Sequence, residues 1–444
     1  MEKRTFAKSL KLQKDIHRVI PGGCHTYAKG DDQFPEFIPP LIASGKGCRV
    51  WDVDGNEYIE YGMGSRAVSL GHAYPSVNAA ACKQLDQGSN FARPAAIELK
   101  AAEEFLAMVP GADMVKFAKN GSDVASAAIK LARAYTGRSK IAFCEDHPFF
   151  SIDDWFIGTT AMKRGIPTGQ LELSVGFRFN DIDSVNKLFE THPQEIACFI
   201  LEPEKHERLN MNFIRELQQL CRDHGSLLIL DEMITGLRWH LGGAQTLYDI
   251  VPDLSTFGKA MGNGFAVSAL AGKREIMELG GLRNSEERVF LLSTTHGAEN
   301  HALAAFIAVV DAYKQMDVVD YLQYQGERLR QGMLKTIAEH NLTDYVGVHG
   351  HPAALIYSTA DHENKGSQPF RTLFLQESLK RGLLAPSLVL SFSHKDEDVD
   401  QTLEIVHESL GIYRKALDNG IDQYLEGRPV QPVFRKFNHP EQSM

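Results

Sequence analysis

The chain has 444 residues, a net charge of −10 and 43% hydrophobic residues, a balance typical of a folded protein with two or three domains. A site for a nucleic-acid backbone needs a basic patch, and the sequence has no long basic run, so we expect no nucleic-acid partner. No long uninterrupted apolar run occurs either, and we expect no membrane span.

The cysteines point to a reducing compartment. They are scattered, no two stand at CxxC spacing, and we predict neither a disulfide framework nor a metal site. The first residues include basic side chains but lack the apolar stretch of a secretory signal. We therefore expect a cytoplasmic protein.

The first elements in chain order are a helix and a hairpin. Apolar residues recur at helical spacing over residues 4–19, and Pro21-Gly22-Gly23 ends that pattern. The run CRVWDVDGNEYIEY reads as two strands joined by the turn pair Asp54-Gly55. We expect residues 1–60 to join a small domain.

Strands and helices alternate from about residue 75 to 275. Apolar strands are predicted at 115–119, 140–144, 197–202 and 226–232, with helices at 122–135 and 213–224. This order predicts an α/β fold with a mostly parallel sheet covered by helices, in a large domain over 61–325. Ligands bind at the carboxyl ends of such strands. After helices at 300–340, residues 326–444 read as a smaller α+β domain that ends in a surface tail from 426.

Two residues near these strand ends carry the chemistry. Asp231 ends an apolar strand, and Lys259 follows 28 residues later in FGKAMGNG. A lysine between glycines and apolar residues is partly desolvated, which favours the neutral amine that a Schiff base requires. Taken alone, Asp231 reads as a helix cap and Lys259 as a solvated loop lysine. Only the pair, on one predicted sheet, favours catalysis.

A second pattern stands between strand 115–119 and its helix. Gly121 permits close approach of a ligand, and the helix N-terminus offers free N–H groups to an anion. Ser122 could bind a phosphate or cap the helix.

Together these blocks resemble the class III pyridoxal-phosphate aminotransferases, and within them the glutamate-1-semialdehyde aminomutase group. The resemblance runs from PGG (21–23) to SHKDEDVDQTL (393–403) and includes KNGSDVASAAIKLARAYTGR, LLILDEMITGLRWHLGGAQ and PDLSTFGKAMGNGFAVSALAGKREIM. It implies pyridoxal phosphate as cofactor and an aspartate aminotransferase-like fold of type I.

The resemblance also implies a role for each matching residue. Lys259 corresponds to the lysine that binds the cofactor and later moves the proton, and Asp231 to the partner of the pyridine nitrogen. Gly121 and Ser122 correspond to the phosphate cradle. Phe149 aligns with a ring that stacks on the cofactor, with Phe150 as the alternative. Thr295 corresponds to a threonine that reaches the neighbouring subunit's phosphate, which implies a homodimer with shared sites.

The substrate residues depart from the group. The loop after Pro21 holds Lys29 where the aminomutases carry an arginine for the substrate carboxylate, with His25 and Tyr27 just before it. The stretch 202–206, which begins with Glu202, has unusual charge. We name Arg66 as a further substrate-binding candidate.

The expected function is amino transfer from an amino-acid donor to an aldehyde or ketone acceptor. The loop at 21–35 and the tail RPVQPVFRKFN resemble members associated with carbohydrate biosynthesis, which favours a sugar-like acceptor. Three alternatives stay open: a glutamate-1-semialdehyde 2,1-aminomutase, an amino-acid racemase or epimerase, and a non-catalytic regulator that binds the cofactor.

Overall fold

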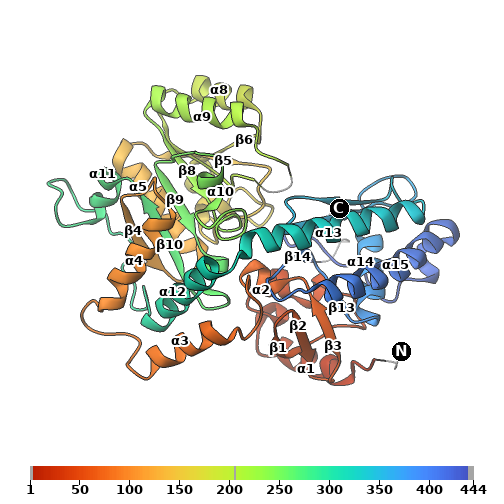
Figure 1. The fold of residues 1–444 in the computed structure, drawn as a ribbon. Helices are drawn as coiled ribbons and strands as arrows, with labels where there is room; N and C mark the ends of the chain where they lie inside the picture. The colour runs from red at the N-terminus through yellow and green to blue at the C-terminus, as the bar shows by residue number, and fades with distance from the viewer. Residues whose placement is uncertain (1–3, 205–206, 439–444) are drawn as a thin grey trace. The chain divides into compact units, whose positions relative to one another are not determined.

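The computed structural model describes residues 4–204 and 207–438. The chain forms two compact units (Figure 1). Unit 1 comprises Met1–Tyr74 and Asp320–Arg435, and unit 2 comprises Pro75–Val319 with Lys436–Met444.

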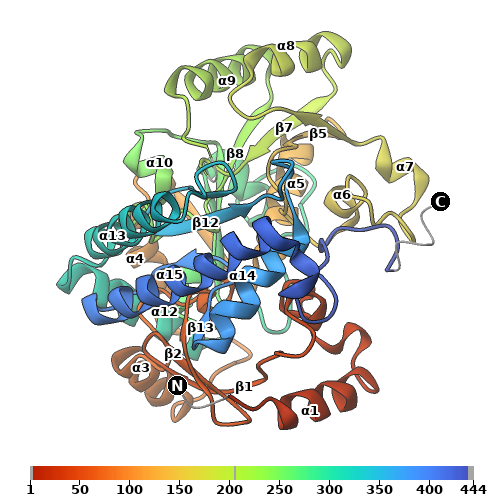
Figure 2. The same ribbon diagram turned by 90° about the vertical axis from the view of Figure 1, so that its right-hand side faces the viewer.

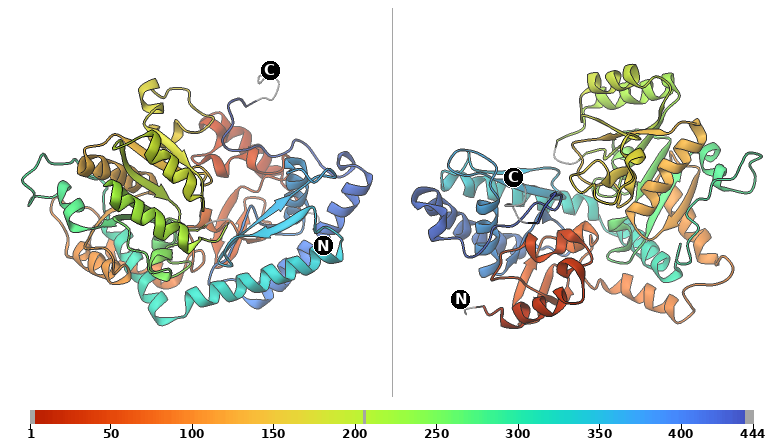
Figure 3. Two further views of the ribbon diagram at one scale, coloured as in Figure 1. Left: turned by 90° about the horizontal axis from the view of Figure 1, so that it is seen from above. Right: turned by 180° about the vertical axis from the view of Figure 1, so that it is seen from behind.

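Unit 2 is built on a sheet with helices packed against it (Figure 3). The sheet has seven strands in the order β4-β10-β9-β8-β7-β5-β6. Neighbouring strands from β9 to β6 run parallel, whereas β10 is antiparallel to both β4 and β9. The strands are β4 (Met114–Ala118), β5 (Lys140–Cys144), β6 (Ser174–Phe177), β7 (Ile196–Leu201), β8 (Leu227–Asp231), β9 (Leu254–Phe257) and β10 (Ser268–Gly272). The sheet is therefore mostly parallel, as predicted.

Helices pack against this sheet because each carries an apolar face. Helix α5 contacts β7, β9 and β10, α8 contacts β6, and α9 contacts β8. The glycine after α9, Gly225, has φ 65° and ends that helix in the left-handed conformation expected of a C-terminal cap. The helices are α3 (Pro75–Leu85), α4 (Ala96–Met108), α5 (Gly121–Thr136), α6 (Asp154–Ile157), α7 (Thr168–Leu171), α8 (Ile182–Thr191), α9 (Met211–His224), α10 (Gly243–Leu247), α11 (Arg274–Met277) and α12 (Asn300–Gln315), with short 3-10 turns η4 (Lys259–Gly262) and η5 (Glu278–Gly280).

Unit 1 contains two small sheets, β1-β2-β3-β13 and β11-β12-β14. Its strands are β1 (Ile42–Lys46), β2 (Arg49–Asp52), β3 (Glu57–Glu60), β11 (Val346–His349), β12 (Ala354–Thr359), β13 (Leu383–Leu384) and β14 (Leu388–Val389). The hairpin β2–β3 turns at Asp54-Gly55 as predicted, and β13 joins it in parallel, so the N-terminal segment and the C-terminal third share one sheet.

Helix α14 packs against β12 and β13, and α14 and α15 lie side by side (Figure 2). The helices of unit 1 are α1 (Ala7–His17), the turn α2 (Met63–Arg66), α13 (Val318–Glu339, which starts at the unit boundary), α14 (Gln368–Lys380) and α15 (Asp396–Asn419), with 3-10 turns η1 (Pro21–Gly23), η2 (Tyr27–Lys29), η3 (Asp31–Gln33) and η6 (Ile421–Gln423). One core cluster joins the N-terminal and C-terminal segments of unit 1. It contains Ile38, Val50, Tyr58, Leu379 and Leu384.

The unit boundaries fall at 74/75 and 319/320, whereas the sequence patterns placed them at 60/61 and 325/326. Residues 61–74 belong to unit 1 because their backbone bonds to its strands: the Tyr61 amide donates to the Leu384 carbonyl at 2.9 Å. Residues 320–325 belong there because the Tyr321 hydroxyl donates to the His394 carbonyl at 2.8 Å.

The predicted surface tail is anchored at its start. The Val430 amide donates to the Thr372 hydroxyl at 2.8 Å, and the side chain of Val430 is buried. The last part of that tail, residues 439–444, lies outside the described residues. Within the described ranges, no helix is both long and apolar enough to cross a membrane.

Candidate active site

Asp231 is a buried carboxylate at the carboxyl end of β8, with 2% of its surface exposed. Its Oδ1 accepts hydrogen bonds from the Met233 amide at 3.0 Å and the Thr256 hydroxyl at 3.2 Å. Burial and the negative charge of Glu202 raise the pKa of Asp231 to about 7, against the positive charge of Lys259. A carboxylate in this position is stabilised by a bound cation.

Lys259 lies beside that carboxylate although 28 residues separate them in sequence. The cause is the parallel pairing of β8 with β9, which sets Asp231 opposite Thr256, three residues before the lysine. Lys259 is half-buried and has φ 44°, a left-handed conformation that is unfavourable for a lysine. Such backbone strain is concentrated at functional sites.

Met233 links the lysine loop to the β4–α5 loop. A Cβ atom at Gly258 would lie 2.7 Å from the Met233 sulfur, and one at Gly121 would lie 3.0 Å from it. A Cβ at either position would therefore press on the thioether, which packs between the two loops. The close approach of a ligand to Gly121 stays a prediction.

The N-terminus of α5 forms the other side of the site. Asn120 caps it, since its side-chain oxygen accepts from the Asp123 amide at 3.1 Å, so the alternative that Ser122 is the cap is wrong. The Ser122 hydroxyl instead accepts from the Ile152 amide at 3.1 Å. The first N–H groups of a helix have no acceptor within it, and here they belong to Gly121 and Ser122.

His147, which was not among the predicted site residues, is buried in this region. Its Nδ1 accepts a hydrogen bond from the Glu202 amide at 3.1 Å, and its ring lies 4.9 Å from that of Phe179. The contact fixes the end of β7, where Glu202 is 3% exposed. The signal available in the sequence was a histidine three residues after the end of strand 140–144. Lys205 and His206, which follow Glu202, lie outside the described residues.

The two phenylalanines after His147 differ in burial. Phe149 is 45% exposed, whereas Phe150 is 2% exposed and packs edge-on against Phe156. The exposed ring is the one available to a ligand. Thr295 is also exposed, in the loop before α12, where its carbonyl accepts from the Asn90 side chain at 3.0 Å.

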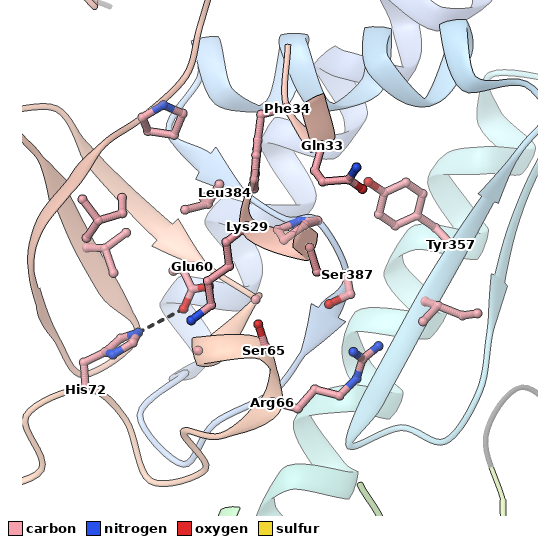
Figure 4. Close-up of a pocket in the computed structure, with 18 of the residues that line it drawn as sticks. Lys29, Gln33, Phe34, Glu60, Ser65, Arg66, His72, Tyr357, Leu384 and Ser387 are labelled. Carbon is pink, nitrogen blue, oxygen red and sulfur yellow. Dashed lines mark hydrogen bonds and ion pairs between the residues drawn. The ribbon is translucent and has the colours of Figure 1, made fainter. Parts of the chain in front are cut away.

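Residues of unit 1 line a cavity of about 690 Å³. Lys29 and Arg66 both line it, together with Glu60 and His72, which share a hydrogen bond of 3.0 Å (Figure 4). His25 and Tyr27 are exposed and are not among its lining residues. Two of the predicted substrate residues are thus brought to one cavity, and the volume suits a small-molecule ligand.

Comparison with known proteins assigns the chain to a family. The family model described as aminotransferase class-III matches residues 27–410. This chain is a class III aminotransferase. A glutamate-1-semialdehyde 2,1-aminomutase of Caldicellulosiruptor saccharolyticus is 30% identical over 90% of this chain and 97% of its own length. A 3-aminobutyryl-CoA aminotransferase of Cloacimonas acidaminovorans is 29% identical over 94% and 100%.

A solved structure gives the same result for the fold. The FumI protein of Sphingopyxis sp. MTA144, solved in its PLP internal aldimine form, is 26% identical and covers 93% of this class III aminotransferase and 97% of its own chain, with a TM-score of 0.83. The fold is that of the type I PLP-dependent transferases, and the cofactor is pyridoxal phosphate, as the resemblance implied.

The residues of unit 2 fit that cofactor. A buried carboxylate whose pKa is about 7 suits a protonated pyridine nitrogen, and a half-buried lysine beside it suits an aldehyde. The N-terminus of α5 suits a phosphate group. Among the described residues, no cluster of three or more histidine, cysteine, aspartate or glutamate side chains could hold a metal ion.

Proposed function

We propose that this aminotransferase moves an amino group from an amino-acid donor to an aldehyde or ketone acceptor of sugar-like character. The observation that carries the proposal is the electrostatic pairing of Lys259 with the buried Asp231 at adjacent strand ends. Mixing the holoenzyme with single amino acids, followed by single carbonyl compounds, tests it. We expect a spectral change with the donor and its reversal by the acceptor, and a silent spectrum with every donor would reject it.

In this proposal, Lys259 attaches the cofactor through its Nζ and then holds the proton that leaves the substrate carbon. Asp231 stays charged opposite the pyridine nitrogen, while Gly121 and Ser122 receive the phosphate at the start of α5. When bound, pyridoxal phosphate supplies an electron-poor ring that stabilises negative charge at the substrate carbon. We assign the stacking position to Phe149 because its ring is exposed.

We further propose a homodimer in which Thr295 reaches the phosphate of the neighbouring subunit. Two large apolar side chains in the same segment support an interface: Leu282 is 84% exposed and Phe290 is 71% exposed. Sedimentation on dilution tests this arrangement, because activity per chain should fall as dimers dissociate. A fully active monomer would reject a shared site.

We propose that the acceptor contacts Lys29, Arg66, His25, Tyr27 and Glu202. An arginine grips a carboxylate through a planar fork, whereas lysine offers one point charge on a flexible stem, so Lys29 is a poor substitute for the aminomutase arginine. These five side chains include both hydrogen-bond donors and acceptors. Such a mixed set suits the several hydroxyl groups of a sugar-like compound better than it suits a small amino acid. We place the enzyme in the cytoplasm, in keeping with its free and mostly buried cysteines.

A glutamate-1-semialdehyde 2,1-aminomutase is the second candidate, because several curated relatives at 30–32% identity have that name. Incubation with glutamate-1-semialdehyde separates the two. We expect poor formation of 5-aminolevulinate, and efficient conversion would make the aminomutase the better description.

A further inference from the structure

Four consecutive residues of unit 1 adopt left-handed backbone conformations. The φ angles are 43° at Met63, 59° at Gly64, 60° at Ser65 and 73° at Arg66. Only glycine tolerates this region freely, so three of the four residues are held against their preference. A whole turn of this kind persists only where the surrounding structure enforces it, and such turns are found at functional sites.

The surroundings of the turn provide that enforcement. The Arg66 amide donates to the Gly62 carbonyl at 3.0 Å, and the Val68 amide donates to the Met63 carbonyl at 3.0 Å. Met63 and Val68 are buried in one cluster with Val389 of β14. Met63 and Val68 thus hold the turn from the apolar core of unit 1. The left-handed turn ends at Arg66, whose side chain lines the unit 1 cavity.

More basic than acidic side chains line the cavity. Its lining includes Lys29, Arg66 and Arg371, against the single carboxylate of Glu60, which pairs with His72. Arg371 is fixed in place: it donates to the Pro386 carbonyl at 2.8 Å and lies 5.0 Å from the centre of the Tyr357 ring. The Arg66 guanidinium and the Glu60–His72 pair stand apart in the cavity, and Lys29 extends toward that pair (Figure 4).

We propose that Arg66, presented by the left-handed turn, binds a phosphate group on the carbonyl acceptor. This inference rests on the proposed amino transfer and names its substrate class: a phosphorylated, polyhydroxylated aldehyde or ketone. A guanidinium matches a phosphate through two parallel hydrogen bonds. A phosphate dianion suits a lining that contains three basic side chains, and the Glu60–His72 pair offers an acceptor and a donor to hydroxyl groups at the other end.

Matched acceptors that differ only in the anionic group test the assignment. D-erythrose 4-phosphate is compared with D-erythrose, and succinic semialdehyde with butanal, each at a fixed concentration of a working donor. For the wild-type enzyme we expect kcat/KM to be at least about tenfold higher for the phosphorylated sugar than for the neutral one. Equal values for the two sugars, or a preference confined to the carboxylate pair, would overturn the proposal.

The variant Arg66→Gly removes the guanidinium and also suits the left-handed backbone, so it should fold, and a thermal melt verifies this. We expect it to abolish the preference for the phosphorylated sugar, and Arg66→Lys to restore part of it. Arg18→Ala, which removes an exposed arginine directly after α1, is the control for lost charge and should keep the preference. Retention of the preference in Arg66→Gly would contradict the assignment, as would a change confined to the donor KM.

Binding without turnover separates this proposal from the proposed function. Calorimetric titration of the holoenzyme uses glycerol 3-phosphate and glycerol, which carry no carbonyl group and cannot react, while the cofactor occupies its own phosphate site. Binding of the phosphate ester alone, lost in Arg66→Gly, supports the anion site even if no donor changes the spectrum. Failure of the wild-type holoenzyme to bind the ester would overturn it even if amino transfer proceeds.

Discussion

Replacement of Asp231 by asparagine should change how the stability of the apoprotein depends on pH. The side chain is buried at the end of β8, where its Oδ1 accepts hydrogen bonds from Met233 and Thr256. Asparagine has the same shape and can retain an acceptor oxygen at that place, but it never carries the charge. The variant therefore removes the free-energy cost of burying a charged carboxylate without a loss of packing.

The size of the effect follows from the pKa. Burial and the charge of Glu202 raise the pKa of Asp231 from 3.8 to about 7. Since a tenfold change in proton affinity corresponds to about 1.4 kcal/mol, the charged carboxylate costs the folded state up to about 4 kcal/mol. A carboxyl with a raised pKa stabilises the folded state at acidic pH. That contribution is lost as the pH rises from about 4 through 7.

The assay is urea unfolding of the apoprotein at a series of pH values between 5 and 8.5. We expect the wild-type free energy of unfolding to fall over this range, and the fall to be smaller by about 3 kcal/mol in Asp231→Asn, since the rest of the effect lies below pH 5. Some dependence should remain, because burial also raises the pKa of Glu232 to about 7. Wild-type holoenzyme should lose less stability than apoprotein, because the bound cofactor offers a cation to Asp231. Equal pH dependence in the variant and wild-type apoproteins would refute the reasoning.

Three further changes probe the site. Gly258→Ala should lower the melting temperature and cofactor occupancy, because a Cβ there lies 2.7 Å from the Met233 sulfur; Met233→Ala in the same chain should restore part of both, and no rescue would argue against this contact. Ser122→Ala should weaken cofactor binding about tenfold in an equilibrium titration, the loss expected for one hydrogen bond to a charged group, and unchanged affinity would remove it from the cradle. Lys29→Ala and Tyr27→Phe should raise the acceptor KM and leave the donor half-reaction unaltered, and an altered donor step would reject that assignment.

The main features of unit 2 could be predicted because its strands and helices follow local rules. Strands β7 and β8 are wholly buried and read as continuous apolar runs, and Gly225 marks the end of α9. The sequence could not reveal that β10 enters the sheet antiparallel, because its small apolar residues, SALAG, fit either direction. Strand direction depends on the path of the intervening chain.

The site was predictable only in part, because some of its contacts depend on how distant parts of the chain pack together. Asp231 and Lys259 could be identified because their blocks are distinctive, and the pairing of β8 with β9 explains how they meet. The contact between His147 and Glu202 joins residues 55 apart through packing, which no local pattern reveals. The left-handed turn at 63–66 was also missed, because tertiary contacts impose it on Met63, Ser65 and Arg66.

The most direct test of the account is to locate the cofactor on the chain. Borohydride reduction of the holoenzyme, followed by proteolysis and mass spectrometry, identifies the lysine that carries it. We predict a pyridoxyl group on Lys259, and loss of both that adduct and amino transfer in Lys259→Ala, while the folded variant still binds the cofactor weakly through its phosphate. An adduct on another lysine of the wild-type chain, or normal activity in Lys259→Ala, would contradict the central claim.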